Sequence, residues 1–265
     1  MKEKEIRLNK YLSEAGVCSR READRLIAAG KVKIDGETAQ VGAKVKEGQR
    51  VLVKGKEAAP IQKKILLAFY KPKGIVCTAE KMEENNIIDY INYPERIYYA
   101  GRLDKDSEGL ILLTNYGDIV NKMMRSANGH EKEYVVKVNK KLTDEFLTKM
   151  AGRVPLEEIN AVTKPSKVTK VDDYTFKIIL TQGLNRQIRR MCMYFGYRVV
   201  ALKRIRVMNI KLGNLKRGEY RDVTETELAE LMRLLSDSDN RPMALREGKN
   251  NGSNGTNQRT DRQTK

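Results

Sequence analysis

Residues 101–114 read GRLDKDSEGLILLT, a charged loop followed directly by four large apolar residues. An apolar run of this kind, bounded by turn residues, is typical of a strand buried in a core. The charged residues therefore lie where a core strand meets the surface, a common position for functional side chains. Arg102 and Asp104 are two residues apart, so on an extended backbone their side chains point to the same side.

Three interpretations are open for the acidic residues of this loop. The spacing of Asp104, Asp106 and Glu108 before Gly109 resembles the start of a calcium-binding loop. That interpretation fails at the twelfth position, where Asn115 replaces the bidentate glutamate. Composition alone favours the second interpretation, a solvated turn between two strands. The third interpretation is a catalytic carboxylate at Asp104.

The charge of the chain indicates a polyanionic partner. Its 265 residues include 52 Lys and Arg against 35 Asp and Glu, a formal net charge of +17, which favours nucleic acid. One histidine and three dispersed cysteines argue against a Cys/His zinc cluster and a disulfide framework. No apolar run is long enough to span a bilayer, and no apolar signal core follows the first residues. We therefore expect a cytoplasmic protein without a membrane anchor.

Residues 5–55 predict a small unit of two short helices and a sheet. Gly16 ends the first apolar stripe, and Ser19 precedes RREADRLIAAG with Glu22 at the capping-box spacing. The following residues alternate between apolar and charged around the turn pair Asp35-Gly36. Residues 54–64 are polar and contain a proline, which predicts a linker.

Residues 65–236 predict a second, larger unit in which strands outnumber helices. Strand patterns are expected at 65–70, 75–79, 97–113, 131–140, 162–170, 174–181 and 198–212, with helices at 142–150, 184–196 and 224–235 and a short amphipathic segment after Asp118. The fold class is therefore α+β, with a mixed, mainly antiparallel sheet and a few flanking helices. We expect domains at 1–60 and 61–236, and a disordered tail at 237–265, which has few apolar residues.

The N-terminal run RLNKYLSEAGVCSRREADRLIAAGKVKIDG resembles the S4 RNA-binding domain, an αL-type module, in order, spacing and turn residues. Any one basic residue here could be ordinary solvated charge. The resemblance implies that a set of polar and basic side chains binds RNA phosphates and sugars without reading sequence. That set contains Arg7, Lys10, Ser19, Arg20, Arg21, Lys31 and Lys33.

The second unit resembles the RsuA/RluB/RluF-type ribosomal RNA pseudouridine synthases. Four motifs carry the resemblance in the same order: FYKPKGIVCT, GRLDKDSEGLILLT, EKEYVV and LNRQIRRM. With TQGLNRQIRRM and SANGHEKEY, the chain is most similar to the F-type enzymes of large-subunit (23S) rRNA. The resemblance implies isomerisation of uridine in a structured RNA stem-loop, without metal or other cofactor.

The same resemblance assigns the site residues. Asp104 is the essential carboxylate, Tyr134 the active-site tyrosine that stacks on the detached uracil, and Arg189 the basic partner of the aspartate. The target base must leave the helix, and Arg102 is expected to fill the vacated space, with Leu103 and Ile188 contacting the substrate. Phosphate contacts are expected from Lys71, Lys73, Arg186 and Arg190. Whether Asp104 attacks C1′, adds to the uracil ring or removes the C2′ proton stays open.

Three other functions are alternatives on the sequence alone. A non-catalytic S4-type rRNA-binding or ribosome-assembly protein would explain the charge equally well, but it would not need Arg102, Asp104, Tyr134 and Arg189 together. A synthase acting on 16S rRNA or tRNA is a further alternative. An RNA-cleaving hydrolase is disfavoured by the single histidine and by the lack of a metal-spaced carboxylate cluster. We expect a monomer.

Overall fold

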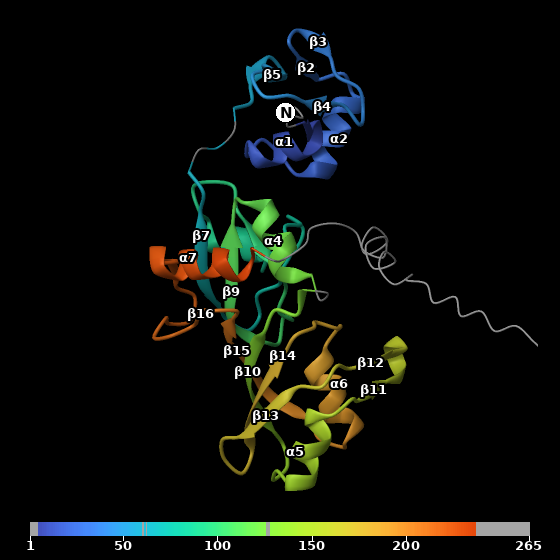
Figure 1. Ribbon diagram of the computed structural model, residues 1–265, viewed down its shortest axis with the longest axis vertical. Coiled ribbons are helices and arrows are strands. Elements are labelled where there is room, and N and C mark those ends of the chain that lie inside the picture. Colours follow the sequence, from blue (N-terminus) through green and yellow to red (C-terminus); the bar gives the residue numbers. More distant parts are fainter. Residues whose placement is uncertain (1–4, 60, 62, 126–127, 237–265) are drawn as a thin grey trace, which may run out of the picture.

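The computed structural model describes residues 5–59, 61, 63–125 and 128–236, and within them the chain forms two units joined near residue 60 (Figure 1). We call residues 5–59 the N-terminal unit and residues 65–236 the C-terminal unit. The predicted disordered tail, 237–265, lies outside the described residues. In the described part no helix could cross a membrane, since the longest, α7 (Glu225–Leu234), has ten residues.

The N-terminal unit consists of two helices and two small sheets. Helices α1 (Leu8–Glu14) and α2 (Arg20–Ala28) pack on each other. The Ser19 hydroxyl accepts a hydrogen bond from the Glu22 N–H at 3.2 Å, which confirms the predicted helix start. The strands are β1 Ile6–Arg7, β2 Val32–Ile34, β3 Glu37–Thr38, β4 Lys44–Val45, β5 Val51–Val53 and β6 Lys56–Glu57, with β1 paired to β4 and the others in the order β3-β2-β5-β6.

Two tight hairpins close this sheet. Asp35 and Gly36, with φ of 50° and 91°, join β2 to β3, as the sequence predicts. Lys54 and Gly55 form a second such turn, with φ of 48° and 79°, and join β5 to β6. The prediction of a linker from residue 54 is therefore wrong at its start, because residues 54–57 complete the sheet.

The C-terminal unit is built on one sheet that contains nine of the described strands. Its main order is β13-β14-β10-β15-β9-β7-β17, with β8 on β9 and β16 on β15. Only β9 and β15 pair in parallel among these, so the predicted mixed, mainly antiparallel sheet is confirmed. The strands are β7 Leu66–Lys71, β8 Tyr98–Ala100, β9 Glu108–Thr114, β10 Lys132–Val138, β13 Lys167–Lys170, β14 Thr175–Leu180, β15 Val199–Val207, β16 Ile210–Lys211 and β17 Tyr220–Asp222.

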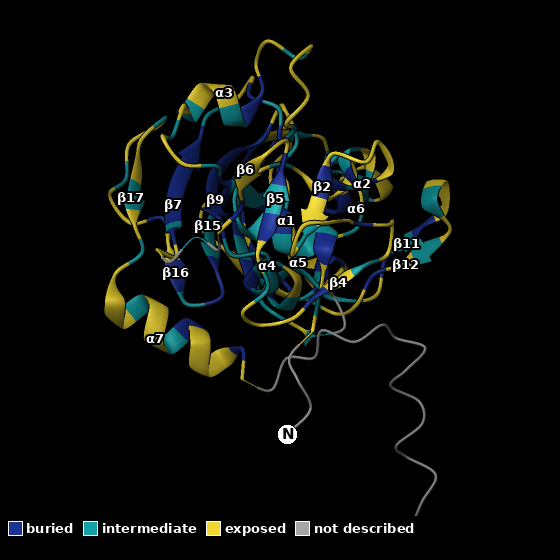
Figure 2. Ribbon diagram, turned by 90° about the horizontal axis from the view of Figure 1, so that it is seen from above, coloured by how far each residue is buried: buried dark blue, intermediate teal, exposed yellow. Residues whose placement is uncertain are grey.

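Strand β9 is the centre of the core, and all seven of its residues are buried (Figure 2). Its side chains alternate between two clusters, with Ile111 and Leu113 on one face of the sheet and Leu110 and Leu112 on the other. Helices cover both faces, so an uninterrupted apolar run is stable here. Helices α3 (Ile87–Ile91), α5 (Asp144–Ala151) and α6 (Gln187–Tyr194) contribute to the first cluster, and α4 (Gly117–Met124) and α7 to the second.

Two strand predictions differ from the structure. Residues 75–79 form one isolated bridge, Val76 with Asn86, because their backbone pairs with the start of α3 instead of a neighbouring strand. The predicted strand 162–170 is split into β12 (Ala161–Val162), which pairs with β11 (Pro155–Leu156), and β13. Pro165 lies between β12 and β13 and has no N–H to donate to a strand partner.

The register between three adjacent strands determines which residues meet at the head of β9. Gly109 on β9 pairs with Arg204 on β15, and Arg204 pairs with Tyr134 on β10. Gly109 has φ of 113°, and a Cβ there would lie 2.6 Å from the Arg204 backbone nitrogen. Only glycine allows β9 and β15 to approach this closely directly after the acidic loop.

Candidate active site

The loop between β8 and β9 is held by three backbone contacts. The Leu103 N–H donates to Cys77 Sγ at 3.4 Å, Ser107 N–H to the Asp104 carbonyl at 3.1 Å, and Gly74 N–H to the Lys105 carbonyl at 2.8 Å. Leu103 itself is buried against the core. The loop backbone is thus fixed while the side chains of Arg102 and Asp104 line the same cavities, as their spacing predicts.

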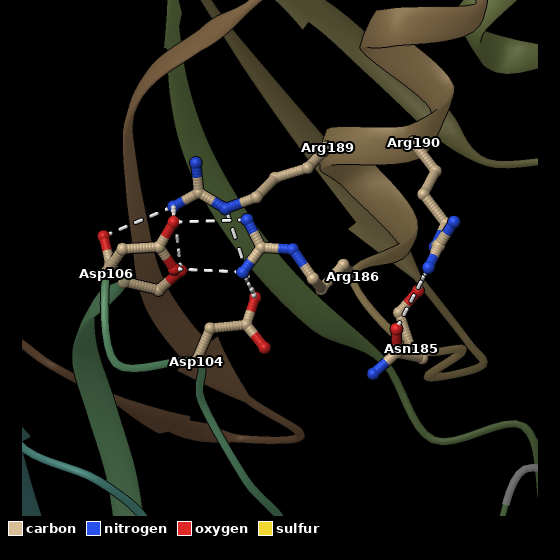
Figure 3. A network of polar contacts seen from close by, with 7 residues as sticks. Asp104, Asp106, Asn185, Arg186, Arg189 and Arg190 are labelled. Atoms are coloured by element: carbon tan, nitrogen blue, oxygen red, sulfur yellow. Dashed lines mark hydrogen bonds and ion pairs between the residues drawn. The ribbon is translucent and has the colours of Figure 1, made fainter.

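Two arginines from the head of α6 lie over this loop (Figure 3). The Asp104 Oδ2 is 3.7 Å from Arg186 Nη1 and 3.9 Å from Arg189 Nε. Arg189 Nε is buried and has no hydrogen-bond partner among the described residues. A small movement of the Asp104 carboxylate would therefore give it a charge-assisted hydrogen bond.

Asp106 holds both guanidinium groups more closely than Asp104 does. Its carboxylate accepts from Arg186 at 3.2 and 3.3 Å and lies 3.2 Å from Arg189 Nη2, which also donates to Ser107 Oγ at 3.1 Å. Burial alone would raise the pKa of Asp106, but the Arg186 hydrogen bond and the charges of Arg189 and Arg186 outweigh it and lower that pKa. Asp106 thus stays ionised and orients the two arginines.

This role of Asp106 was not predicted from the sequence, where the residue was interpreted as a metal ligand or as solvated charge in a turn. The usable signal was its position two residues after Asp104, which places both carboxylates on one side of the loop. The metal interpretation finds no support among the described residues, where no group of three ligands occurs. Glu108 lies in β9, buried, with its Oε2 at 2.9 Å from Arg217 Nε.

Asp104 lies between two cavities that share part of their walls. The smaller, about 120 Å³, has polar and charged side chains in its walls as well as six apolar ones, which are Leu103, Tyr134, Leu180, Leu184, Ile188 and Leu202. The larger, about 480 Å³, is bordered by Arg102, Lys105, Lys132, Arg186 and Arg204. Arg102, Asp104 and Tyr134 line both, so the structure brings together the residues that the motifs placed far apart in sequence.

Gln182 is a further lining residue that the sequence argument did not name. Its side chain is buried in the wall of the smaller cavity, and its Nε2 has no hydrogen-bond partner among the described residues. A buried, unpaired amide donor in a ligand-sized cavity is a candidate contact for a polar atom of a substrate. Its position in TQGLN, just before the basic helix, was the available signal.

The prediction that Lys71 contacts an RNA phosphate is wrong. Its side chain is completely buried, and its ammonium donates to the carbonyl oxygens of Pro72 and Ile75 at 2.9 and 2.8 Å. Burial lowers the pKa of Lys71 below its ordinary value. The residue closes the turn after β7 and is not accessible to a phosphate, whereas its neighbour Lys73 is exposed.

Arg186 and Arg190, which were expected to contact phosphate, form contacts within the chain instead. Arg186 is engaged with Asp106 and Asp104, as described above. Arg190 forms an ion pair with Glu158 and donates to the Asn185 carbonyl at 3.1 Å, away from the aspartates (Figure 3). Both guanidinium groups therefore have carboxylate partners within the chain.

The predicted RNA-binding residues of the N-terminal unit are exposed with one exception. The exposed ones are Arg7, Ser19, Arg20, Arg21, Lys31 and Lys33. Lys10 is instead half-buried between the two units, with its Nζ at 2.7 Å from Asp118 Oδ1 and 3.5 Å from Glu14 Oε1. It joins the N-terminal unit to the start of α4 in the C-terminal unit, so the prediction of an RNA contact is not supported.

Comparisons with known proteins agree with this architecture. Residues 65–194 match the family model described as RNA pseudouridylate synthase, and residues 6–51 match the S4 domain. The chain is 51% identical to the dual-specificity RNA pseudouridine synthase RluF of Escherichia coli O6:H1, over 88% of this chain and 80% of that protein.

Two more distant comparisons extend this result. The ribosomal large subunit pseudouridine synthase B of Bacillus subtilis is 34% identical, over 86% of this chain and 96% of that protein. A crystal structure of a pseudouridylate synthase aligns with a TM-score of 0.64 at 28% identity, over 85% of this chain and 99% of that one.

An S4 domain attached to a mixed sheet, with a carboxylate and arginines at a cavity, defines an RNA-modifying enzyme that carries its own RNA-binding unit. Among such enzymes the relatives and the fold agree on one reaction. The chain belongs to the RNA pseudouridine synthase family.

Proposed function

We propose that this chain converts uridine to pseudouridine in ribosomal RNA of the large subunit, with Asp104 as the essential carboxylate. The observation that carries the proposal is the Asp104 carboxylate at the boundary of two cavities. It lies 3.9 Å from Arg189 Nε, which has no hydrogen-bond partner among the described residues. The name of the Bacillus subtilis relative supports the large subunit. The name dual-specificity, carried by the RluF relatives, supports a second RNA substrate besides this one.

The reaction exchanges one bond of the nucleotide for another. The N1–C1′ bond breaks, the uracil turns, a C5–C1′ bond forms, C5 loses its proton and N1 ends with one. A carboxylate beside the sugar suits this chemistry, because it can act at an anomeric carbon as a covalent or electrostatic partner. We assign this carboxylate to Asp104. The assignment is the same whether Asp104 attacks C1′, adds to the uracil ring or removes the C2′ proton.

Tyr134 and Arg189 act on the two sides of the carboxylate. The Tyr134 ring forms part of the smaller cavity, where it can stack on the detached uracil with its oxygen near C5. Arg189 is fixed by Asp106 and Ser107 and presents Nε to Asp104. Leu103 and Ile188 complete the walls around the base, and the smaller cavity is the uracil site.

Arg102 takes the place of the base in the RNA helix. It is exposed at the edge of both cavities, so its planar guanidinium can stack and form hydrogen bonds where the uridine has left. Extrusion of a base costs a few kcal/mol and is least costly in loops and irregular stems. The substrate is therefore a structured stem-loop, which residues 1–60 dock through phosphate and sugar contacts while residues 61–236 perform the reaction.

The enzyme needs no second copy for this arrangement, because one chain contributes every residue assigned to the site. We therefore propose a monomer, working in the cytoplasm where ribosomal RNA is made.

The test of this function is the substitution Asp104→Asn. It removes the carboxylate and keeps the size of the side chain, so rRNA binding is expected to remain while release of tritium from C5-labelled uridine is lost. The matched control is Asp222→Asn, the same change on the edge strand β17, which is expected to keep full activity.

Full turnover by Asp104→Asn would refute the assignment of Asp104. If wild-type enzyme also released no tritium from any ribosomal RNA, a non-catalytic binding role would replace the proposed function.

A further inference from the structure

Two buried basic side chains line the larger cavity on adjacent strands. Lys132 on β10 is 7% exposed and Arg204 on β15 is 2% exposed. Arg204 pairs directly with Tyr134, and Lys132 lies two residues before Tyr134. All three side chains therefore project from the same face of the sheet, next to the Asp104 loop.

Neither cation has an acidic partner among the described residues. Within the part of the chain that the structure describes, the Lys132 ammonium donates only to the His130 carbonyl, at 3.3 Å. Arg204 Nε donates to the Leu110 carbonyl at 2.6 Å, while its Nη2 is buried without a hydrogen-bond partner in that part of the chain. Burial, and then the charge of Arg204, lower the pKa of Lys132 to about 8.

Such a pair is costly for the folded protein. Two buried like charges repel each other, and a buried charge without a counter-ion loses its hydration without compensation. Arg206, by contrast, is paired with Glu131 and Glu133 at 2.9 Å. The buried Lys71 ammonium donates to two backbone carbonyl oxygens and lines neither cavity. Retaining an unpaired cation pair in a cavity wall indicates that an anion completes it.

The cavity restricts which anion fits. Among its charged side chains only Asp104 is acidic, against five basic ones. Three of the five have other functions or partners, since Arg102 is exposed at the edge, Lys105 lies 3.6 Å from Glu83 and Arg186 is held by Asp106. The substrate of the proposed function carries one anionic group per nucleotide, the backbone phosphate. The smaller cavity contains the Tyr134 ring and aliphatic side chains on which a base can pack, so the larger cavity, with its excess of basic side chains, suits the sugar-phosphate side.

We propose that Lys132 and Arg204 form a phosphate subsite, which binds a backbone phosphate flanking the flipped nucleotide. The proposal rests on the proposed function and specifies how the substrate is held beside Asp104. Arg204 supplies a guanidinium that is fixed by Leu110, and Lys132 supplies a point charge on a flexible stem. The bound phosphate offsets the repulsion between the two cations, so the subsite is strongest when occupied.

The test combines a protein substitution with a neutral phosphate. The substrate is a stem-loop RNA that contains the target uridine, located by sequencing the product, with either flanking phosphate replaced by a methylphosphonate. In wild-type enzyme one of the two replacements is expected to weaken binding about tenfold, as for loss of one charge-assisted contact. Lys132→Met is expected to bind unmodified RNA about tenfold more weakly and to lose nothing more on that replacement.

Two further variants serve as controls. Lys137→Met, the same change at an exposed position of β10, is expected to behave as wild type on all three RNAs. Lys132→Arg keeps the charge, so it is expected to retain most of the affinity and the sensitivity to the methylphosphonate. If Lys132→Met does not fold, the affinity of Lys132→Arg for the three RNAs still tests the proposal.

Equal methylphosphonate penalties in wild type and Lys132→Met would overturn the proposal, as would the absence of a penalty at both phosphates. A fall in turnover with unchanged RNA affinity would overturn it too, and would instead place the cations on the detached uracil. These outcomes are separate from the proposed function, which fails if Asp104→Asn keeps its turnover or if the wild-type enzyme releases no tritium from ribosomal RNA.

Discussion

At the scale of single residues, the two carboxylates of the acidic loop have different environments. Asp106 takes the short contacts of Arg186 and Arg189, whereas Asp104 stays at 3.7 and 3.9 Å from the same two guanidinium groups. Asp106 therefore satisfies most of the positive charge at the head of α6. Asp104 is left oriented but free to engage a substrate atom, which is the arrangement that a reacting carboxylate requires.

This division leads to an expectation for Asp106→Asn. The neutral amide cannot hold both arginines, so Arg189 would lose its orientation toward Asp104. We expect kcat to fall about tenfold, the effect of weakening one charge-assisted hydrogen bond, with KM nearly unchanged. Steady-state kinetics on the RNA substrate measure kcat and KM separately. The variant Asp106→Glu keeps the charge and is expected to recover part of kcat. Asp106 would have no positioning role if its asparagine variant matched Asp222→Asn in both constants.

The depressed pKa of Lys132 makes the stability of the protein depend on pH. The folded-state value of about 8 lies below the ordinary 10.5, so between these values the unfolded chain binds more protons at this site. Stability from this group therefore rises with pH across that window, and the full cost of burial is present below pH 8. Lys132→Met removes that cost, on the order of 3 kcal/mol at pH 7.

Chemical unfolding at pH 7 and at pH 10 measures this effect. We expect Lys132→Met to be more stable than wild type at pH 7 and to lose most of that advantage at pH 10. The exposed Lys137→Met is expected to show neither effect. A less stable Lys132→Met at pH 7 would mean that the buried ammonium stabilises the fold rather than serving a ligand. The expected combination of higher stability and weaker RNA binding is typical of residues retained for function.

At the scale of elements, the head of β9 links the fold to the site. The parallel pairing of β9 with β15 brings Gly109 against the Arg204 backbone, directly after the acidic loop. The same pairing places Arg204 opposite Tyr134. The close approach of two strands at one glycine therefore fixes both the loop and the wall of the larger cavity.

The substitution Gly109→Ala is expected to disturb both the acidic loop and the wall of the larger cavity. Its φ of 113° is strained for any other residue, and the added methyl group would collide with the Arg204 backbone, which cannot move independently of the sheet. We expect the free energy of unfolding to fall by about 3 kcal/mol. Denaturant titration checks this, with Gly152→Ala as the control, where the new Cβ would meet only the Lys149 carbonyl at an ordinary 3.4 Å. A loss of less than 1 kcal/mol would mean that β9 and β15 can separate freely.

At the scale of the whole molecule, direct contacts join the two units. Lys10 joins them through Asp118, and Arg96 Nη1 donates to the Ser13 carbonyl at 3.4 Å. Burial alone would lower the pKa of Lys10, but the hydrogen bond and charge of Asp118 outweigh it and raise that pKa. The ion pair thus persists at neutral pH and limits how the N-terminal unit is oriented to the site.

Docking by the N-terminal unit predicts a strong dependence of RNA affinity on salt. Replacing the exposed Arg20, Arg21 and Lys31 by alanine removes up to three phosphate contacts and the counterions they release. We expect weaker binding at low salt and a plot of log affinity against log salt that is less steep by about two to three units. Titrations at several salt concentrations measure the slope. The control is a triple alanine variant of the exposed Lys137, Lys140 and Lys177 in the C-terminal unit; an equal effect in both variants would assign no special role to the N-terminal unit.

Features that depend on neighbouring residues could be predicted from sequence. The cap at Ser19, the turn at Asp35-Gly36 and the buried run of β9 all follow from local hydrogen bonding and periodicity. The set Arg102, Asp104, Tyr134 and Arg189 came from motif resemblance, and the fold places all four around one pair of cavities or within ion-pair distance of Asp104. Their chemical roles stay predictions until the substitutions are tested.

The amino-acid sequence by itself determined the two units, the central strand with its acidic loop and the RNA-modifying class, because each depends on patterns within a few tens of residues. Only the tertiary structure decided the partners of the charges: that Lys71 is buried, that Lys10 joins the units, that Asp106 holds two arginines and that Lys132 lies beside Arg204 unpaired. These partners are brought together by the order and register of the sheet. A lysine or arginine has the same sequence signature in water, in an ion pair or in a cavity wall, so its role follows from what the fold places within a few ångströms of it.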